Sequence, residues 1–283
     1  MRWLLAAFLV LPLSAHAQHI VAAENFYGDV ARDIAGPQAQ IASILDNPDQ
    51  DPHLFEASPS VARQLAGAQI VVVNGADYDP WMDKLLQAHA APGRIVIKVA
   101  DLIGRKPGDN PHLWYDPATM PAFARALAAA LDKVQPDHAA EHAKRLEAFL
   151  ASLKPLDAEV ARLRARYAGI PVTATEPVFG YMADALGLGM RNMGFQIAVM
   201  NDTEPKASDV AAMENDLTQH QVRVFFYNSQ ATDAAAQRLM GLAHTAHVPV
   251  VGVTETEPKG KNYVGWMMSQ LHALDHALAK PAA

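Results

Sequence analysis

The chain has 283 residues, of which 51% are hydrophobic and 19% charged, and it contains no cysteine. This composition is typical of a well-packed globular protein, and the length favours two lobes over one. The lack of cysteine excludes disulfides, thiolate metal sites and cysteine nucleophiles, and a formal net charge of −7 disfavours nucleic acid and anionic lipid surfaces as partners.

Residues 1–17 have the features of a secretory signal peptide. Arg2 supplies a positive charge, the apolar run that follows is too short to span a bilayer, and Ala15 and Ala17 are small residues ahead of Gln18. We therefore expect cleavage after Ala17, leaving 22 basic and 30 acidic residues. Since no cysteine could carry a lipid, we expect no membrane anchor and place the protein in a periplasm.

Residues 18–116 alternate short β-branched runs with amphipathic stretches, which predicts an α/β lobe with a mostly parallel sheet flanked by helices. Ser58 followed by Pro59 is a typical helix start, because serine caps the first turn and proline suits the first helical position. We expect strands at 20–23, 40–45, 70–74 and 94–100, and helices at 26–34, 59–65 and 80–89.

Residues 117–168 contain no strand pattern and are rich in Ala, Leu, Glu, Lys and Arg. This composition predicts two or three helices, interrupted near Pro136 and Pro155, that connect the two lobes. Residues 169–283 then resume the alternation and predict a second α/β lobe. Its expected strands are 170–175, 195–200, 222–227 and 248–253, and its expected helices are 179–186, 207–219, 234–244 and 263–278.

Two histidines stand out because each follows a proline in a loop past the carboxyl end of an expected strand. His53 and His112 both belong to a Pro-His-Leu-aromatic pattern. In open α/β sheets ligands bind at this edge, and the preceding proline stiffens the loop. We interpret the histidines of helical stretches as exposed surface residues; these are His138, His142, His220, His244, His272 and His276.

The second half of the chain places carboxylates at comparable positions. Glu176 follows one expected strand and Glu255 another, with Glu257 two residues further on. Two imidazoles and two carboxylates without sulfur suit a divalent ion such as manganese, zinc or iron(II). Either glutamate alone would be read as an ordinary loop carboxylate, so the hypothesis of a metal site depends on the whole set.

Several short motifs occur together along the mature chain. They are Asp51-Pro52-His53 with Glu56 and Ser58-Pro59-Ser60, Val72-Val73-Asn74-Gly75, Asn110-Pro111-His112-Leu113-Trp114 with Asp116-Pro117, Phe179-Gly180-Tyr181, and Val253-Thr254-Glu255. In this combination the chain resembles the solute-binding proteins of zinc and manganese ABC transporters, the cluster that includes the metal-binding lipoprotein adhesins. The resemblance covers essentially the whole mature chain.

The resemblance implies two α/β lobes joined by a long backbone helix, with one metal held in the cleft by one ligand from each of four loops. By position these ligands would be His53, His112, Glu176 and Glu255. Zinc members usually have a histidine at the position of Glu176 and manganese members a glutamate, so the match favours manganese while zinc stays open. The fourth ligand is commonly aspartate, and Glu257 stays open as an alternative to Glu255.

The sequence thus predicts a periplasmic solute-binding protein, not an enzyme, that captures Mn²⁺ or Zn²⁺, or Fe²⁺, for an ABC importer. The expected partners are the transporter's permease and, through it, its ATPase; we expect a monomer. One alternative is a metal-dependent enzyme with a His₂-carboxylate site, for which Glu257 or Asp116 would have to act as acid or base. Another is a siderophore- or haem-binding protein of the same two-lobe fold, which would need a large aromatic or basic cleft.

Overall fold

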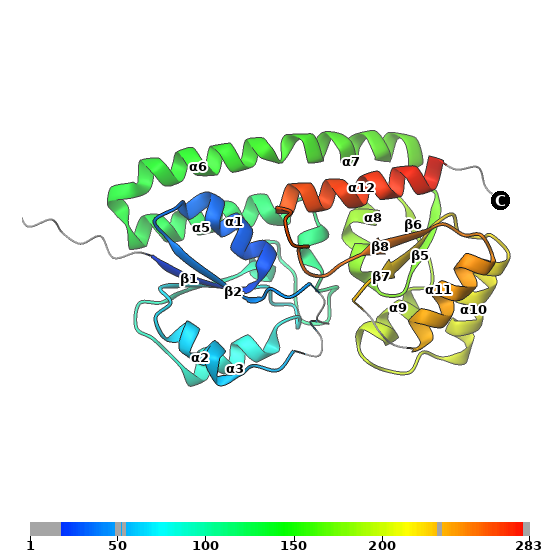
Figure 1. Cartoon of the computed structure of the whole chain (residues 1–283), viewed down its shortest axis with the longest axis horizontal. Helices are drawn as coiled ribbons and strands as arrows, with labels where there is room; N and C mark the ends of the chain where they lie inside the picture. Colours follow the sequence, from blue (N-terminus) through cyan, green and yellow to red (C-terminus); the bar gives the residue numbers. More distant parts are fainter. Residues whose placement is uncertain (1–17, 49–51, 53–54, 231–233, 280–283) are drawn as a thin grey trace, which may run out of the picture.

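The computed structural model describes residues 18–48, 52, 55–230 and 234–279. In these ranges the strands form two four-stranded sheets, and all the strand pairings are parallel. The two lobes lie side by side along the longest axis of the molecule, with helices around each sheet (Figure 1). The predicted fold class, two parallel-sheet lobes joined by a long helical segment, is confirmed.

The first sheet has the strand order β2-β1-β3-β4. Every residue of its third strand is buried, because a parallel strand covered on both faces needs an unbroken apolar run. Val71 and Val73 face α2 and α3, whereas Ile70 and Val72 belong to the main core. The elements are β1 His19–Glu24, α1 Asn25–Ala35, β2 Gln40–Leu45, α2 Pro59–Ala66, β3 Ile70–Val73, α3 Pro80–Ala88, β4 Ile95–Lys98, α4 Val99–Leu102 and the 3₁₀ turn η2 Leu113–Tyr115.

The second sheet has the order β6-β5-β7-β8, so β7 lies between β5 and β8. Because the carboxyl ends of parallel strands meet at one edge, the residues that follow these three strands are neighbours. The elements are β5 Pro171–Ala174, η4 Pro177–Phe179, α8 Gly180–Leu186, β6 Gly189–Met190, α9 Met193–Met200, α10 Ala207–Thr218, β7 Phe225–Asn228, α11 Ala234–Thr245, β8 Val250–Val253 and α12 Tyr263–Ala279.

The prediction of a strand at 195–200 is wrong, because these residues form most of α9. The strand beside β5 is instead β6, a two-residue strand that the sequence pattern did not reveal. After β6, Asn192 adopts a left-handed conformation with φ of 59°, which turns the chain out of the sheet and into the helix. A short apolar run has too little periodicity to distinguish a strand from a helix. The other predicted elements overlap the observed ones, with ends shifted by a few residues.

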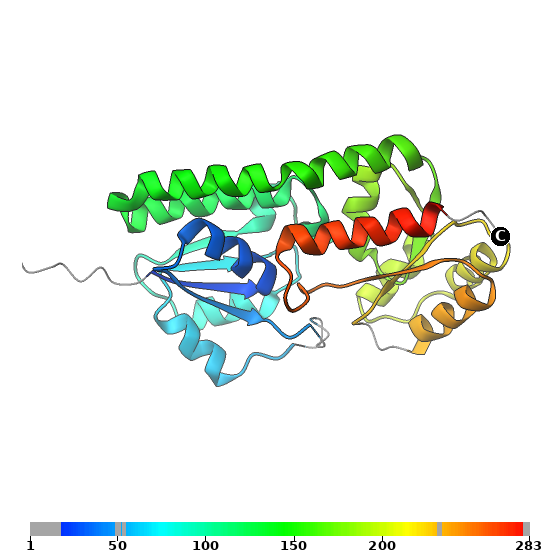
Figure 2. The ribbon, with the colours of Figure 1, turned by 45° about the horizontal axis from the view of Figure 1, so that its top comes forward.

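Three helices connect the lobes: α5 Thr119–Val134, α6 Ala139–Ser152 and α7 Lys154–Tyr167. The 3₁₀ turn η3 Pro136–His138 separates the first two, as predicted near Pro136. Pro155 lies in the first turn of α7, where its missing N–H costs no helical hydrogen bond, so α6 and α7 run on as one rod over both lobes (Figures 1 and 2). Residues of α6 contact α1 and α5, and residues of α7 contact α8 and α12.

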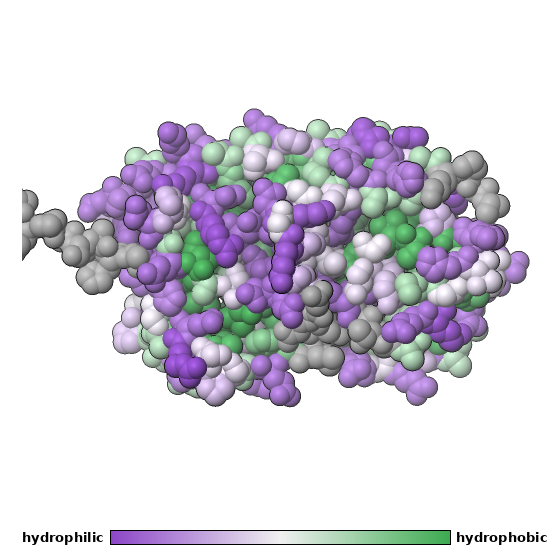
Figure 3. Space-filling view, viewed as in Figure 1, coloured by the Kyte–Doolittle hydropathy of each residue, from purple (hydrophilic) through white to green (hydrophobic). Residues whose placement is uncertain are grey.

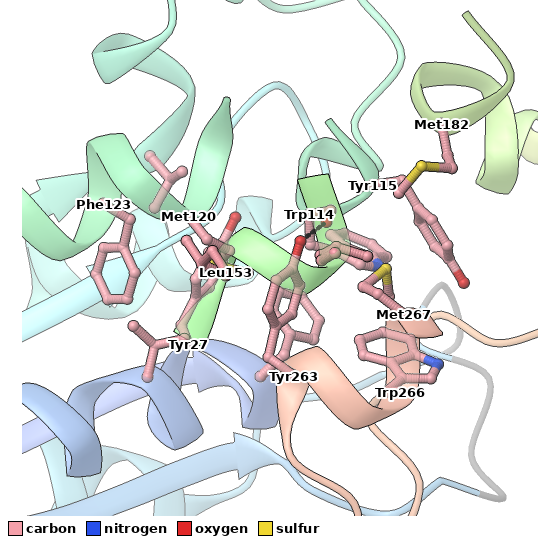
Figure 4. Packing of buried hydrophobic residues seen from close by; sticks show 14 of the residues in the cluster. Tyr27, Trp114, Tyr115, Met120, Phe123, Leu153, Met182, Tyr263, Trp266 and Met267 are labelled. Carbon is pink, nitrogen blue, oxygen red and sulfur yellow. Dashed lines mark hydrogen bonds between the residues drawn. The ribbon is translucent and has the colours of Figure 1, made fainter. Parts of the chain in front are cut away.

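The lobes share one hydrophobic core. The rings of Phe26 and Trp114 of the first lobe pack at a tilt of 32° with centroids 4.5 Å apart, and the ring of Trp266 of α12 lies 5.9 Å from that of Phe26. Tyr263, also in α12, donates a hydrogen bond of 2.8 Å to the carbonyl of Trp114, which is the dashed line in Figure 4. Since α12 follows the second sheet in the chain, its aromatic residues join the two lobes.

The face shown in Figure 3 is covered mainly by hydrophilic side chains. Within the described ranges, no helix has both the length and the apolar character needed to cross a membrane. The predicted signal peptide, residues 1–17, lies outside the described residues.

Candidate metal centre

Three of the four predicted metal ligands are described, and all three are buried. His112 immediately precedes η2 in the first lobe, Glu176 precedes η4 just past β5, and Glu255 lies two residues beyond β8. Their exposed fractions are 0%, 5% and 0%. The fourth predicted ligand, His53, lies outside the described residues.

Asn110 fixes the ring of His112. Its Oδ1 lies 2.7 Å from His112 Nδ1 and also accepts the backbone N–H of His112, while its Nδ2 donates to the carbonyl of Pro177 at 2.7 Å. These three contacts identify Oδ1 as the acceptor, so Nδ1 carries the proton in the neutral ring. The second ring nitrogen, Nε2, is then the metal donor, as in the usual arrangement of a metal-binding histidine.

Asn74, the residue after β3, is hydrogen-bonded to the loop that carries His112. Its Nδ2 donates to the carbonyl of Pro111 at 2.9 Å, and its Oδ1 accepts the hydroxyl of Tyr27 at 2.7 Å. The carboxylate of Asp79 in turn accepts the backbone N–H groups of Asn74 and Gly75, while burial raises the pKa of Asp79 to about 6. The imidazole is therefore supported by a network within the first sheet.

Glu255 brings a carboxylate of the second lobe to this imidazole. Its Oε2 lies 3.3 Å from His112 Nε2 and accepts the hydroxyl of Tyr78 at 3.1 Å. Burial, and then the carboxyls of Glu255 and Glu24, raise the pKa of Tyr78, so the hydroxyl stays protonated as a donor. Two donors that each lie about 2.0–2.1 Å from one tetrahedral ion are about 3.3–3.4 Å apart, so the observed separation suits a shared ion.

Glu176 is joined to Glu255 through the amide of Asn228, the last residue of β7. Asn228 Nδ2 donates to Glu176 Oε1 at 3.1 Å and to Glu255 Oε1 at 2.7 Å. The strand order explains this arrangement, because β7 lies between the strand that precedes Glu176 and the strand that precedes Glu255. One amide thus holds both carboxylates at the same end of the sheet.

Glu257 has different surroundings from Glu255. Its backbone N–H and carbonyl both pair with the side chain of Asn25 at the start of α1. Burial, and then Asp29, raise the pKa of Glu257 to about 8. The carboxyl of Glu257 therefore belongs to the contact with α1, while the carboxylate of Glu255 faces His112.

The helical histidines lie apart from this cluster. His272 and His276 are exposed on α12, as expected. The prediction that His142 is exposed is wrong: it is 1% exposed and its Nδ1 lies 2.8 Å from Asp132 Oδ1, because α6 packs against α5 there. His142 thus joins two connector helices.

Among the described residues alone, no group of three or more His, Asp or Glu side chains is arranged to hold a metal ion. The described part of the centre is a pair of facing donors, His112 and Glu255, with Glu176 linked through an amide. Sequence reasoning missed the residues that orient these donors. Polar amide residues at or soon after the ends of strands, or two positions before a candidate ligand, are the signal that could have revealed them; they are Asn74, Asn228, Gln230 and Asn110.

The chain has relatives of known role. A family model described as zinc-uptake complex component A, periplasmic, matches residues 20–277. In sequence the chain is similar to the manganese-binding lipoprotein MntA of Bacillus subtilis, with 23% identity over 282 residues that cover 92% of this chain and 89% of the relative.

Solved structures share the fold. The periplasmic zinc-binding protein TroA of Treponema pallidum has a TM-score of 0.79 and 21% identity, over 93% of this chain and 100% of that one. A manganese-bound periplasmic metal-binding protein of Candidatus Liberibacter asiaticus has a TM-score of 0.73 and 17% identity, over 92% and 99%. Since the family model spans far more than half of the sequence, this chain belongs to the zinc-uptake complex component A family.

Proposed function

We propose that this protein captures a divalent transition-metal ion, Mn²⁺ or Zn²⁺, and delivers it to an ABC importer. The observation that carries the proposal is the separation of 3.3 Å between His112 Nε2 and Glu255 Oε2. A ring nitrogen whose partner Nδ1 is protonated and a carboxylate oxygen both present lone pairs, and they repel unless a proton or a cation lies between them. Both side chains are buried and come from different lobes, so an ion would bind between the lobes.

The proposed ligands are His53, His112, Glu176 and Glu255. Glu255 is preferred to Glu257 because its carboxylate faces His112, whereas Glu257 contacts α1. Four ligands supplied by the protein alone hold a metal ion and leave no open position for activating a water. The alternative of a metal-dependent enzyme is wrong, because the family consists of components of uptake complexes.

The finer parts of the proposal concern partners and location. The permease and, through it, the ATPase of an importer would receive the ion, and the protein would act as a monomer in the periplasm after loss of residues 1–17. We place the lobes at 18–116 and 169–283, with 117–168 as the connector. The continuous rod of α6 and α7 supports this division, because it spans both lobes (Figure 1).

Metal analysis tests the proposed function. Protein recovered from a periplasmic extract should contain close to one equivalent of manganese or zinc, and chelated protein should take up one equivalent of either ion in a titration. The competition between the two ions then gives the selectivity. If the chelated, folded protein binds neither ion, the proposed function is wrong.

A further inference from the structure

The residue that contacts both carboxylates of the candidate centre is Asn228, which is 1% exposed. Its Nδ2 lies 3.1 Å from Glu176 Oε1 and 2.7 Å from Glu255 Oε1. A single amide group therefore binds one oxygen of each carboxylate. Because two carboxylates side by side repel each other, a shared donor between them stabilises the pair before any ion arrives.

The orientation of this amide is set by the backbone. Asn228 Oδ1 accepts the N–H of Gln230 at 3.1 Å, so Nδ2 has to face the carboxylates. The N–H of Asn228 donates to Thr175 Oγ1 at 3.1 Å, which ties the end of β7 to the end of β5. The amide cannot rotate without breaking the bond to Gln230.

Gln230 fixes the loop of Glu255 in the same way. Its Oε1 accepts the backbone N–H of Glu255 at 2.6 Å and that of Thr256 at 3.2 Å, and its Nε2 donates to Thr256 Oγ1 at 2.9 Å. The backbone of Glu255 and its Oε1 are therefore both held by the segment that follows β7. Oε2 of Glu255 lies 3.3 Å from His112 Nε2 and also accepts the hydroxyl of Tyr78.

We propose that Asn228 is a positioning residue that makes Glu176 and Glu255 each offer the metal ion a single oxygen. This inference rests on the proposed metal site. An ion that is bound by both oxygens of a carboxylate lies at similar distances from the two oxygens. The hydrogen bonds from Asn228 instead direct Oε1 of each glutamate toward the amide. With two imidazoles and two single oxygens the site supplies four donor atoms, which suits zinc, whereas larger ions benefit from more oxygens.

The test is the variant Asn228→Leu, which keeps the volume of the side chain and removes its donor. Both oxygens of each glutamate become available to the ion, so the ratio of the dissociation constant for Mn²⁺ to that for Zn²⁺ should fall about tenfold, in the range found when partners of metal ligands are removed. Competition titrations of the full chain measure the ratio. X-ray absorption of the zinc-loaded variant should show more than four nitrogen and oxygen neighbours.

Gln196→Met is the matched control. Gln196 is also a buried amide of the second lobe, and its Nε2 donates to the backbone carbonyl of Arg191 at 2.6 Å and not to a carboxylate. This variant should lower the melting temperature and leave the affinity ratio unchanged. If Asn228→Leu also weakens both ions equally, Asn228 has only a structural role and the inference is wrong.

The wild-type protein gives a second test that does not require the variant to fold. Zinc in the wild type should have four nearest neighbours at about 2.0–2.1 Å by X-ray absorption. Five or more neighbours would contradict the four-donor site and overturn the inference while leaving the proposed function intact. A wild type that binds no metal would instead refute the proposed function.

Discussion

At the scale of single residues, the two kinds of histidine should respond differently to substitution. His112→Ala and His53→Ala should each weaken metal binding by more than about 100-fold, the upper range for losing a partner of a ligand. His272→Ala and His276→Ala should leave it unchanged, since both are exposed on α12. Titration of the four variants with Mn²⁺ and Zn²⁺ measures this, and equal losses in all four would contradict the ligand assignment.

Glu176 should influence which ion is preferred. A carboxylate oxygen is a harder donor than an imidazole nitrogen, so Glu176→His should move the affinity ratio toward zinc by about tenfold, or about 1.4 kcal/mol. Zinc is expected to bind more tightly than manganese in both forms, because of the general affinity order of divalent ions. A ratio that is unchanged or reversed in competition titrations would show that Glu176 does not set selectivity.

Glu24, the last residue of β1, should make stability depend on pH. It is fully buried, and neither of its carboxyl oxygens has a hydrogen-bond partner among the described residues. Burial, and then Asp79, raise its pKa well above the usual 4.5. Since the folded state keeps a proton that the unfolded state releases, the free energy of unfolding should fall as pH rises above about 4.5.

Glu24→Gln should remove this fall in the free energy of unfolding, because the amide stays neutral at every pH and occupies the same space. The variant should melt at a higher temperature than the wild type at pH 8 and at nearly the same temperature at pH 4. For a chain of this size each kcal/mol corresponds to roughly 2–4 °C. A difference in melting temperature that does not change with pH would mean that the charge of Glu24 is not the cause.

At the scale of elements, Asp275 joins α12 to α7. It accepts hydrogen bonds from Tyr167 and Arg162, both at 2.6 Å, and it lies 3.4 Å from Arg166. The hydrogen bonds from Tyr167, and then from Arg162, lower the pKa of Asp275 below 3.8. The stability that the ionised carboxylate contributes is therefore present above pH 3.8 and is lost as the pH falls through the lowered pKa.

Asp275→Ala should lower the free energy of unfolding by about 1 kcal/mol at pH 7, the usual worth of a hydrogen bond such as the one from Tyr167. Chemical denaturation measures this, and the effect should shrink near pH 2. Tyr167→Phe serves as the control, since it should reproduce much of the loss and add little to Asp275→Ala in the double variant. Metal affinity should not change in either variant, because both residues lie where α7 packs against α12 and not at the candidate metal centre.

At the scale of the whole molecule, the shared core should make the two lobes unfold together. The largest core cluster runs from Ile20 to Leu278 and includes residues of both sheets, the connector and α12. Figure 4 shows a part of this cluster. We expect one calorimetric transition with equal calorimetric and van't Hoff enthalpies. Two separate transitions in the metal-free protein would show that the lobes are independent.

A metal ion bound between the lobes should raise the temperature of that transition. At a free-ion concentration 100 times the dissociation constant, the stabilisation is about 2.7 kcal/mol, or roughly 5–10 °C. Chelated protein resupplied with Mn²⁺ or Zn²⁺ tests this, with Mg²⁺ as a control ion that prefers six oxygen ligands. A melting temperature that neither transition metal alters would contradict the placement of the site between the lobes.

Much of this architecture could be read from local patterns. Strands at 40–45 and helices such as 207–219 were predicted closely, because hydrophobic period, capping residues and prolines act over a few neighbouring residues. The same local signals placed His112, Glu176 and Glu255 beyond strands whose carboxyl ends lie at the binding edge of a sheet. His53 lies outside the described residues, so its part in the centre stays a prediction.

Only the tertiary structure decided which groups face one another. The residues at 195–200 form a helix, and β6 takes the place beside β5 at the edge of the sheet. Glu255 faces His112, whereas the backbone of Glu257 pairs with Asn25 of the first lobe. Asn228 reaches two carboxylates because β7 lies between β5 and β8. These contacts join residues between 27 and 232 positions apart in the chain, and no local pattern specifies a neighbour at that distance.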